Sequence, residues 1–308
     1  MTYDVIILGG SFAGLSAAMQ LARARRSVAV VDNGRPRNRF AATSHGFPGQ
    51  DGRSPVAIRS DLPAELAAYS TASLLDGAAT RIVREDEHFR ITLGDGTEHA
   101  AQRVVLAYGM RDDLPDLPGL VERWGVSVLH CPYCHGHELC QQPVGVLGRD
   151  AGSFHQAMLL PDWGPTTLFT QGFFELPTDH VEALTARGVT IECEPVVALV
   201  GDAPALRAVE LRDGRRVALA GLFLATRTAP ACDLAERLGC VLQDGPTGPF
   251  VTVDAMQATS VPGVFAAGDL ASPVPNAVRA AAAGVMAGSA AHRSLIFDPH
   301  LSGGRNAG

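Results

Sequence analysis

The stretch YDVIILGGSFAG, residues 3–14, decides the fold of this chain. Its first half is a short apolar run rich in β-branched residues, which is typical of a buried strand, and its second half is a glycine-rich turn. A helical segment, LSAAMQLARARR, follows, and a second apolar run, SVAVVD, ends at Asp32. The order of strand, glycine turn, helix, strand and acid is the arrangement that cradles a dinucleotide.

The residue types in this turn each have a physical role in such a site. Gly9 permits the tight turn, and Gly14 lets the helix pack closely on the strand. A pyrophosphate would lie at the start of the helix, where free N–H groups and the helix dipole favour an anion. Ser11 replaces the middle glycine of the usual pattern, and its small side chain still permits close approach of a phosphate. The residues predicted to bind the dinucleotide here are Gly9, Ser11, Phe12, Ala13, Gly14 and Asp32.

The far end of the chain carries a second motif, TSVPGVFAAGD, which is a strand that runs into an acidic turn at Gly268 and Asp269. A helix is expected to open near Asn276. This segment resembles the second FAD motif of the two-domain flavoprotein disulfide reductases. The resemblance implies that Asp269 holds the ribitol chain and that backbone N–H groups at the helix start, at Ala277, face the flavin ring. The strand and turn VVLAYG, ending at Gly109, resembles the return from such an FAD domain.

Bulk properties exclude several classes of protein. The chain has 308 residues and a formal net charge of −7, so it has no global basic surface for nucleic acid or an anionic membrane. No window approaches the ~18–20 apolar residues needed to span a bilayer. The N-terminal apolar run is short and lacks a positively charged start, so we expect a strand, no signal peptide and a cytoplasmic protein. The tail SGGRNAG, residues 302–308, is expected to be loose.

The middle of the chain repeats the βαβ pattern: PVGVLG is a predicted strand, AGSFHQAMLL a helix and TTLFT the next strand. Over residues 3–295 the chain resembles the low-molecular-weight thioredoxin reductase family. This implies an α/β, three-layer fold of two Rossmann-like domains and a homodimer. The FAD domain would comprise residues 1–112 and 245–308, and an NADPH-domain-like insert carrying a CxxC site would comprise residues 113–244.

Two features that bind NADPH in that family are missing. The turn after the insert's first strand reads GRDAGS, which places Asp150 where a central glycine is expected. A carboxylate is bulky and negative where a pyrophosphate should come close. The next strand runs into TQGFFEL, residues 170–176, which has no Arg or Lys to hold a 2′-phosphate but does have Glu175. We therefore predict a degenerate NADP(H) site, with NADPH binding by a variant route as the open alternative.

The insert begins with HCPYCHGHE, residues 130–138, which has four candidate chemistries: half a zinc site, a c-type haem anchor, a thioredoxin-like dithiol, or a dithiol that passes electrons to a flavin. Haem attachment needs an exported chain. A zinc site needs a second ligand pair, and the other cysteines do not pair at suitable spacing, although His135 and His137 remain available. The surrounding pattern is not a thioredoxin fold. We predict no metal and a dithiol at Cys131 and Cys134.

The form CPYCHG, followed by Glu138, resembles a subgroup of that family, the FAD-dependent dithiol oxidases that close disulfides in compounds such as gliotoxin, holomycin and romidepsin. RPRN, with Asn38, and SHGFPG, with His45, also resemble it. The resemblance implies that a small-molecule dithiol attacks Cys131, that Cys134 lies next to the flavin, and that electrons pass through FAD to O2, giving H2O2. An NAD(P)H- or ferredoxin-dependent reductase is the alternative, and a flavin-bearing sensor with little turnover is a third hypothesis.

An oxidase of thiols needs a base, since the thiolate is the reactive form. His135 stands where the reductases keep an aspartate, and an imidazole titrates near neutral pH, so we predict that His135 is this base. His130 and His137 are secondary candidates, for which a structural hydrogen bond is the favoured role. The other cysteines are predicted to be inert buried thiols: Cys140, Cys193, Cys232 and Cys240.

Overall fold

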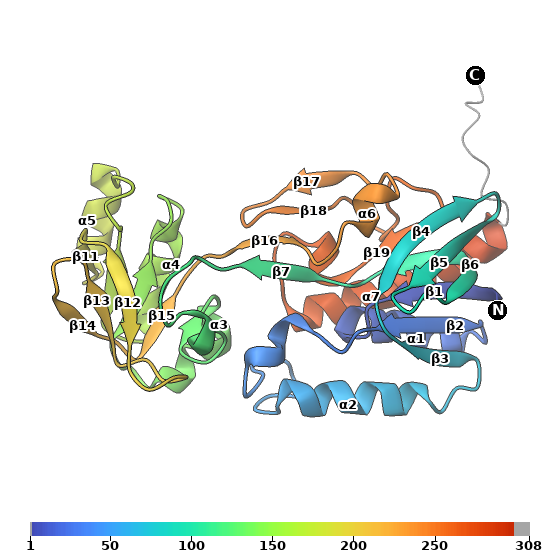
Figure 1. Ribbon diagram of the computed structural model, residues 1–308, viewed down its shortest axis with the longest axis horizontal. Helices are drawn as coiled ribbons and strands as arrows, with labels where there is room; N and C mark the ends of the chain where they lie inside the picture. The colour runs from blue at the N-terminus through green and yellow to red at the C-terminus, as the bar shows by residue number, and fades with distance from the viewer. Residues whose placement is uncertain (1, 299–308) are drawn as a thin grey trace, which may run out of the picture. The chain divides into compact units, whose positions relative to one another are not determined.

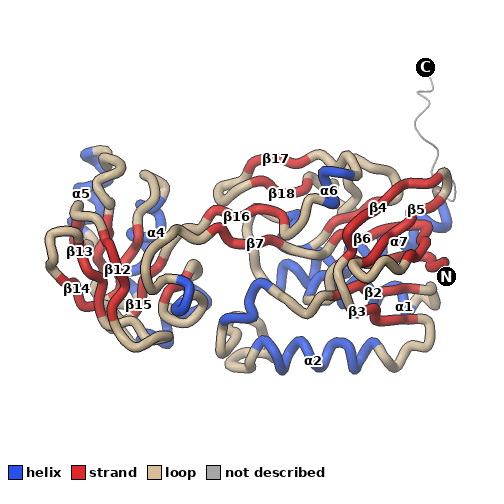
Figure 2. The backbone as a smooth tube through the Cα atoms, in the orientation of Figure 1, coloured by secondary structure: helices blue, strands red, loops and turns tan. Residues whose placement is uncertain are grey.

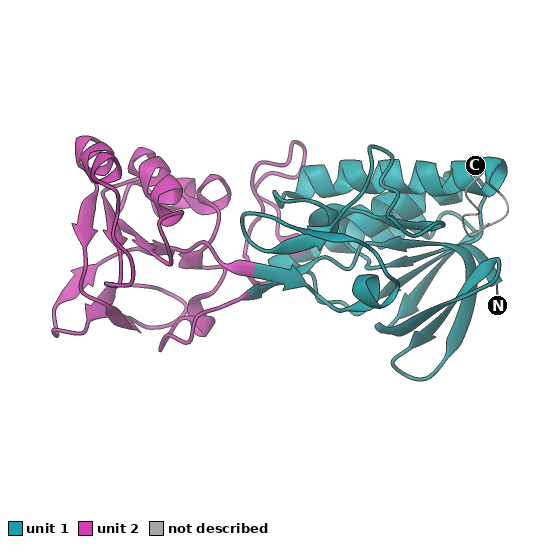
Figure 3. Ribbon diagram, turned by 90° about the horizontal axis from the view of Figure 1, so that it is seen from above, with its two compact units in different colours: residues 1–39, 56–112, 228–308 teal, residues 40–55, 113–227 magenta. Residues whose placement is uncertain are grey.

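A computed structural model describes residues 2–298, so the predicted loose tail lies outside the described residues. The described chain forms two compact units (Figure 3). Unit 1 contains the chain up to Arg39, Val56–Asp112, and the chain from Thr228 onward. Unit 2 contains Phe40–Pro55 and Asp113–Arg227.

Unit 1 is built on a mixed sheet in the order β3-β2-β1-β6-β5-β4, with β19 also paired to β6 (Figure 1). The neighbouring strands β3, β2, β1 and β6 run parallel to one another, and β19 runs parallel to β6. The pairs β4–β5 and β5–β6 are antiparallel. The strands of this sheet are β1 (Thr2–Leu8), β2 (Val28–Asp32), β3 (Ala72–Asp76), β4 (Ala79–Glu85), β5 (His88–Leu93), β6 (Glu98–Leu106) and β19 (Val264–Ala266). The helical elements are α1 (Phe12–Arg23), η1 (Arg37–Phe40), α2 (Pro55–Leu66), α6 (Leu234–Arg237), η5 (Gly268–Ala271) and α7 (Ala277–Phe297).

Alternation along β1 explains why this sheet is a central layer. Val5 and Ile7 belong to the core that includes α1 and α7, whereas Ile6 and Leu8 belong to the core on the other face. All four side chains are at most 2% exposed. Successive side chains of a strand point to opposite faces, so a strand that is apolar at every position must be covered on both sides. This confirms the layered α/β fold.

The helices α1 and α7 pack against each other with almost no side chain between them. A Cβ on Gly284 would lie 2.0 Å from the carbonyl oxygen of Ala13, and one on Gly288 would lie 2.5 Å from that of Ala17. Two glycines four residues apart share one face of α7, so they form a smooth surface for α1. The contact fixes the start of α1, where the dinucleotide was predicted to bind.

Unit 2 is built on a parallel sheet in the order β11-β10-β9-β15-β8, accompanied by the antiparallel strands β12, β13 and β14. Its strands are β8 (Val128–Leu129), β9 (Val144–Leu147), β10 (Thr166–Phe169), β11 (Thr190–Glu192), β12 (Val196–Val200), β13 (Ala208–Leu211), β14 (Arg216–Ala218) and β15 (Gly221–Phe223). Its helical elements are η2 (Val121–Arg123), α3 (Pro132–His135), η3 (His137–Leu139), α4 (Ser153–Leu159), η4 (Leu160–Asp162) and α5 (Thr178–Ala186). Figure 2 distinguishes the helices and the strands of this unit by colour.

The predicted boundaries of the insert differ from the units at two places. The chain returns to unit 1 at Thr228, not at residue 245, and the segment Phe40–Pro55 clusters with unit 2. The first difference arises because β16 (Arg227–Pro230) pairs with β7 (Met110–Asp113), and β17 (Leu242–Asp244) pairs with β18 (Pro249–Val251). These pairings keep residues 228–244 with the first unit. Within residues 2–298, no helix combines the length and the hydropathy that crossing a bilayer requires.

Candidate active site

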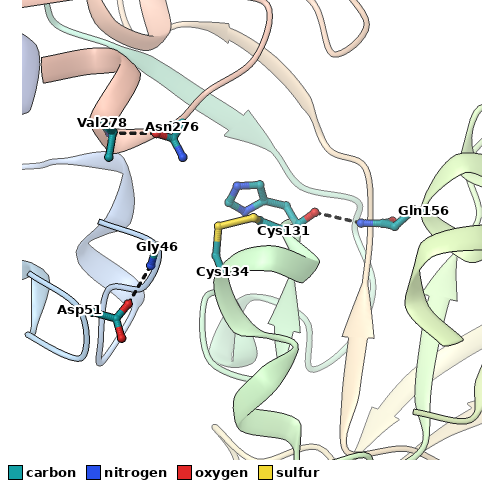
Figure 4. The surroundings of a disulfide bond; sticks show 8 residues. Gly46, Asp51, Cys131, Cys134, Gln156, Asn276 and Val278 are labelled. Atoms are coloured by element: carbon teal, nitrogen blue, oxygen red, sulfur yellow. Dashed lines mark hydrogen bonds between the residues drawn. A yellow bond between two sulfur atoms is a disulfide. The ribbon is translucent and has the colours of Figure 1, made fainter. Parts of the chain in front are cut away.

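The two cysteines of the sequence motif form a disulfide in unit 2. Cys131 and Cys134 are bonded through their sulfurs with their Cα atoms 5.3 Å apart (Figure 4). Cys131 precedes the first turn of α3, and Pro132 occupies the first helical position, where its missing N–H costs nothing. The segment starts at the carboxyl end of β8, which is parallel to β15. The predicted redox pair is therefore assembled at the edge of a parallel sheet where ligands of such folds bind.

Three contacts hold the disulfide segment. A Cβ on Gly136 would lie 2.6 Å from Cδ1 of Trp163, so only glycine permits this approach. The ring of Tyr133 meets the same Trp163 edge-on, with centroids 5.3 Å apart. On the other side, Gln156 of α4 donates its Nε2–H to the carbonyl oxygen of His130 at 2.9 Å (Figure 4). The turn that carries the sulfurs is thus fixed by backbone and aromatic contacts.

His135 directly follows Cys134 and is half-buried. Burial lowers the pKa of His135 below its ordinary value of 6.5; the carboxylate of Glu138 opposes this shift, and the imidazole of His45 adds to it. A lowered pKa keeps the imidazole neutral at neutral pH, which is the form that accepts a proton. His135 is therefore available as a proton acceptor next in sequence to Cys134, and its role as the base stays a prediction.

The segment Phe40–Pro55 brings a second histidine to the disulfide segment. Nδ1 of His45 lies 3.5 Å from Oδ2 of Asp51, and Nε2 lies 3.5 Å from Oε1 of Glu138. Asp51 also accepts the N–H of Gly46 at 2.9 Å, a bond drawn in Figure 4. His45 was predicted as a cofactor residue; the structure groups it with the disulfide segment of unit 2, and its cofactor role stays a prediction.

The turn after β9 shows what Asp150 does. Its Oδ1 accepts the N–H of Gly152 at 2.9 Å, and its Oδ2 accepts Nε–H of Arg149 at 2.9 Å. The N–H of Arg149 in turn donates to the hydroxyl of Ser153 at 3.1 Å. The Arg149 hydrogen bond holds the pKa of Asp150 below its usual value, so the carboxylate is charged. Backbone donors that a nucleotide phosphate would use in this turn bind the protein's own side chains.

The equivalent turn of unit 1 is built differently. Gly9 has φ of +111°, and a Cβ there would lie 2.3 Å from the carbonyl oxygen of Ala107. A Cβ on Gly14 would lie 1.8 Å from the carbonyl oxygen of Gly9. Ser11 has extended φ and ψ of −111° and −161°, so it needs no glycine, and its side chain caps no helix N–H. The turn therefore retains the shape of a dinucleotide site. Unlike the turn at Asp150, the stretch from Gly9 to Gly14 contains no acidic residue that could bind its own backbone N–H groups.

Acidic residues lie at both predicted ribose and ribitol positions. Asp32 is the last residue of β2 and forms an ion pair with Arg59. Its side chain occupies the space that a Cβ on Gly10 would need. Asp269 lies in η5; burial raises its pKa, and the guanidinium of Arg37, 3.3 Å away, opposes that rise. Two acids that could accept hydroxyl hydrogen bonds fit the sugar parts of FAD.

The remaining predicted cofactor residues lie near these turns. Asn276 caps α7, because its Oδ1 accepts the N–H groups of Val278 and Arg279 at 2.9 and 3.2 Å, and Ala277 is the first residue of the helix. Gly268 has φ of +77°, and its Cβ would lie 2.9 Å from that of Ala13. The predicted helix start is confirmed. Of the other predicted residues of unit 1, Phe12 and Ala13 are the first two residues of α1, Asn38 lies in η1, and Gly109 directly precedes β7.

The sequence patterns did not predict that Arg37 pairs with Asp269, the acid of the turn in η5. Arg37 binds Asp112 through Nε at 2.8 Å as well as Asp269, and the Asp112 side chain is only 7% exposed. A buried acid needs a cation, and that requirement was the available signal. The prediction of buried thiols was wrong for Cys140 and Cys193, which are exposed; Cys140 directly follows η3, and Cys193 directly follows β11. Within residues 2–298, no group of three or more His, Cys, Asp or Glu is arranged to hold a metal ion.

Comparison with known proteins identifies the family. The family model for pyridine nucleotide-disulphide oxidoreductases matches residues 3–148 and 179–284. The chain belongs to this family. It is 33% identical over 304 residues to thioredoxin reductase sirT of Leptosphaeria maculans, covering 93% of this chain and 92% of that protein.

Solved structures of this family agree with the fold. An oxidoreductase from Agrobacterium tumefaciens superposes with a TM-score of 0.92 at 44% identity, covering 96% of this chain and 99% of that one. The crystal structure of HlmI superposes with a TM-score of 0.90 at 40% identity, covering 97% and 94%. The protein is a thioredoxin reductase-like flavoprotein of the pyridine nucleotide-disulphide oxidoreductase family, an oxidoreductase of thiols and disulfides, and membership implies FAD as its cofactor.

Proposed function

We propose that this flavoprotein is a dithiol oxidase that forms a disulfide bond in a small-molecule dithiol, with O2 as electron acceptor and H2O2 as product. The observation that carries the proposal is the self-bound turn at Asp150, whose carboxylate accepts the N–H of Gly152 at 2.9 Å. A phosphate at that N–H would have to displace a charged group of the protein and would meet its repulsion. Electrons would therefore enter from thiols.

FAD fits unit 1, because Gly9 and Gly14 stand where a Cβ would clash with the backbone of the turn, and its two acids match hydroxyl groups. We assign the pyrophosphate to the turn from Gly9 to Gly14, the ribose to Asp32 and the ribitol chain to Asp269. When bound, FAD would accept the two electrons that leave the cysteine pair and deliver them to oxygen.

The cysteine pair and His135 account for the thiol chemistry. The first substrate thiol gives its proton to the solvent, its thiolate attacks the sulfur of Cys131, the bond to Cys134 breaks, and Cys134 leaves as a thiolate. The second substrate thiol loses its proton to His135 and attacks the substrate sulfur of the mixed disulfide. Cys131 then leaves as a thiolate, and the substrate disulfide is released. The enzyme dithiol now carries two electrons, and two protons have left the substrate.

A reductase is the second candidate, because sirT and other relatives are named thioredoxin reductases. Such an enzyme would draw its electrons from NAD(P)H or from a donor such as ferredoxin. The segment after β10 favours the oxidase: residues 170–176 contain no Arg or Lys and contain Glu175, so no cation of that segment could hold a 2′-phosphate.

The proposal is tested by stoichiometry in air. Purified holoenzyme with dithiothreitol should consume oxygen and produce one H2O2 for each disulfide formed, and added catalase should return half of the oxygen. The same enzyme with NADPH and oxidised thioredoxin should leave NADPH unchanged. Rapid NADPH oxidation coupled to thioredoxin reduction, without peroxide from the dithiol, would establish the reductase in its place.

A further inference from the structure

The strand that leads to the disulfide is short and shares a core with helix α4. β8 contains two residues, and Leu224 donates its N–H to the carbonyl oxygen of the second, Leu129, at 2.9 Å. The side chain of Leu129 lies in the same buried core as Ala157 of α4 and Leu160, which directly follows that helix. The backbone that enters the turn of Cys131 is therefore packed together with α4.

Gln156 of α4 binds the backbone one residue further along. Its Nε2–H donates to the carbonyl oxygen of His130 at 2.9 Å (Figure 4). The atoms of a peptide group lie in one plane, so a bond that fixes this carbonyl also fixes the plane that contains the N–H and Cα of Cys131. Cys131 has extended φ and ψ of −117° and 110° and carries its sulfur directly after that plane. The direction of the Cys131 side chain therefore depends on the bond that Gln156 makes.

The start of α4 is fixed by the turn at Asp150. Ser153, the first residue of the helix, is 2% exposed. Its hydroxyl accepts the N–H of Arg149 at 3.1 Å, and its own N–H donates to the carbonyl oxygen of Asp150 at 3.0 Å. Gln156 lies three residues further along, so its side chain extends from a backbone with a defined position. The turn whose N–H groups bind the protein itself thus holds the helix that carries Gln156.

The stability of the fold does not account for an amide at position 156. The Gln156 side chain is 8% exposed, and its Oε1 is buried without a hydrogen-bond partner among residues 2–298. An unpartnered buried acceptor lowers the stability of a protein, and an apolar side chain of similar length would avoid that loss. The bond from Nε2 to His130 is therefore the feature that explains this residue.

We propose that Gln156 is a positioning residue of the thiol–disulfide reaction, which holds the peptide between His130 and Cys131 so that the sulfur of Cys131 faces an incoming thiolate. The inference rests on the proposed function, because that function takes Cys131 as the attacked sulfur. The rate of thiol–disulfide exchange depends on which sulfur is attacked and on the access to it. A rotation of this one peptide would change both.

The first measurement is the rate constant for reduction of the oxidised holoenzyme by dithiothreitol without oxygen, followed by counting the free thiols. Gln156→Met keeps the length of the side chain and removes the donor. It should be slowed about tenfold, less than the ~10²-fold that a displacement of about 1 Å can cause. Its thermal midpoint should not fall, because the unpartnered Oε1 is removed as well.

Two controls carry the same substitution. His155→Met changes an exposed residue of the same helix and should react like wild type. Gln171→Met removes a similarly buried amide of unit 2, whose Oε1 accepts the N–H of Val196 at 3.2 Å. It should keep the wild-type rate constant even where its thermal midpoint falls, because its bond does not involve the turn of the disulfide.

The second measurement identifies the sulfur that reacts, which a residue with a merely structural role would not change. Oxidised wild type that is treated briefly with 2-mercaptoethanol, alkylated and digested should carry the mixed disulfide on Cys131. In Gln156→Met a share of the mixed disulfide should move to Cys134, because the peptide that directs the attack is no longer held. Gln156→Leu is the second variant should Gln156→Met fail to fold.

The outcomes separate this inference from the proposed function. An unchanged rate constant in Gln156→Met would overturn the inference and leave the dithiol oxidase intact. A slowed variant whose thermal midpoint falls and whose mixed disulfide stays on Cys131 would do the same. A mixed disulfide on Cys134 in wild type would overturn the inference together with the order of the sulfurs in the proposed function.

Discussion

Replacing either Cys131 or Cys134 by serine should abolish the dithiol-driven formation of peroxide. The disulfide between them is the group that a substrate thiolate attacks, and neither sulfur alone can hold two electrons as a dithiol. We expect a loss on the order of 10⁴-fold or more, the size typical for removal of a nucleophile. Oxygen uptake with dithiothreitol gives the measurement.

The two serine variants should differ in one spectroscopic property. If Cys134 is the sulfur next to the flavin, Cys131→Ser leaves a thiolate there and should show a long-wavelength charge-transfer band, whereas Cys134→Ser should lack it. A band that persists in Cys134→Ser would mean that the roles are reversed. Cys193→Ser, at an exposed free thiol of the same unit, is the control and should retain full turnover.

Replacing His135 by alanine should slow reduction by thiols about 10²-fold near pH 7, the lower range for loss of a general base. The direction of the pH dependence follows from the pKa of His135, which burial lowers from the ordinary value of 6.5. The wild-type rate should rise with pH through a limb below that value, where the imidazole becomes neutral. In the variant this limb should move up toward ~8.5, the pKa of an unassisted thiol.

The pH profile separates a catalytic from a structural role of His135. The loss should shrink above ~8.5, because the thiolate then forms without help, and added imidazole should restore part of the rate at pH 7. A uniform loss at every pH would contradict the assignment of His135 as the base. His155→Ala should leave the profile unchanged, because this exposed side chain is remote in sequence from the cysteine pair.

The parts of the fold that sequence predicted are those encoded within a few residues. The turn from Gly9 to Gly14, with its strand, helix and terminal acid, is local, and the glycines proved to be sterically required. The same holds for the helix start at Asn276, which a single side chain caps. Such features follow from backbone sterics and capping, which depend little on distant residues.

What sequence did not predict depends on residues far apart in the chain. Arg37 forms a hydrogen bond with Asp269, which lies 232 residues further along the chain, and no local sequence pattern predicts such a pair. The contact of His45 with Glu138 arises because Phe40–Pro55 folds with unit 2, although it interrupts unit 1 along the chain. The return boundary at Thr228 was missed for the same reason, since strand pairing between β16 and β7 decides it.

The central claim is that electrons enter from thiols and not from a nicotinamide. The most direct measurement is the absorbance of the oxidised yellow holoenzyme after anaerobic mixing, first with NADPH and separately with dithiothreitol. We expect the flavin to stay oxidised with NADPH and to bleach with the dithiol, and air should restore the yellow colour with formation of H2O2. Rapid bleaching by NADPH, with none by the dithiol, would contradict the account.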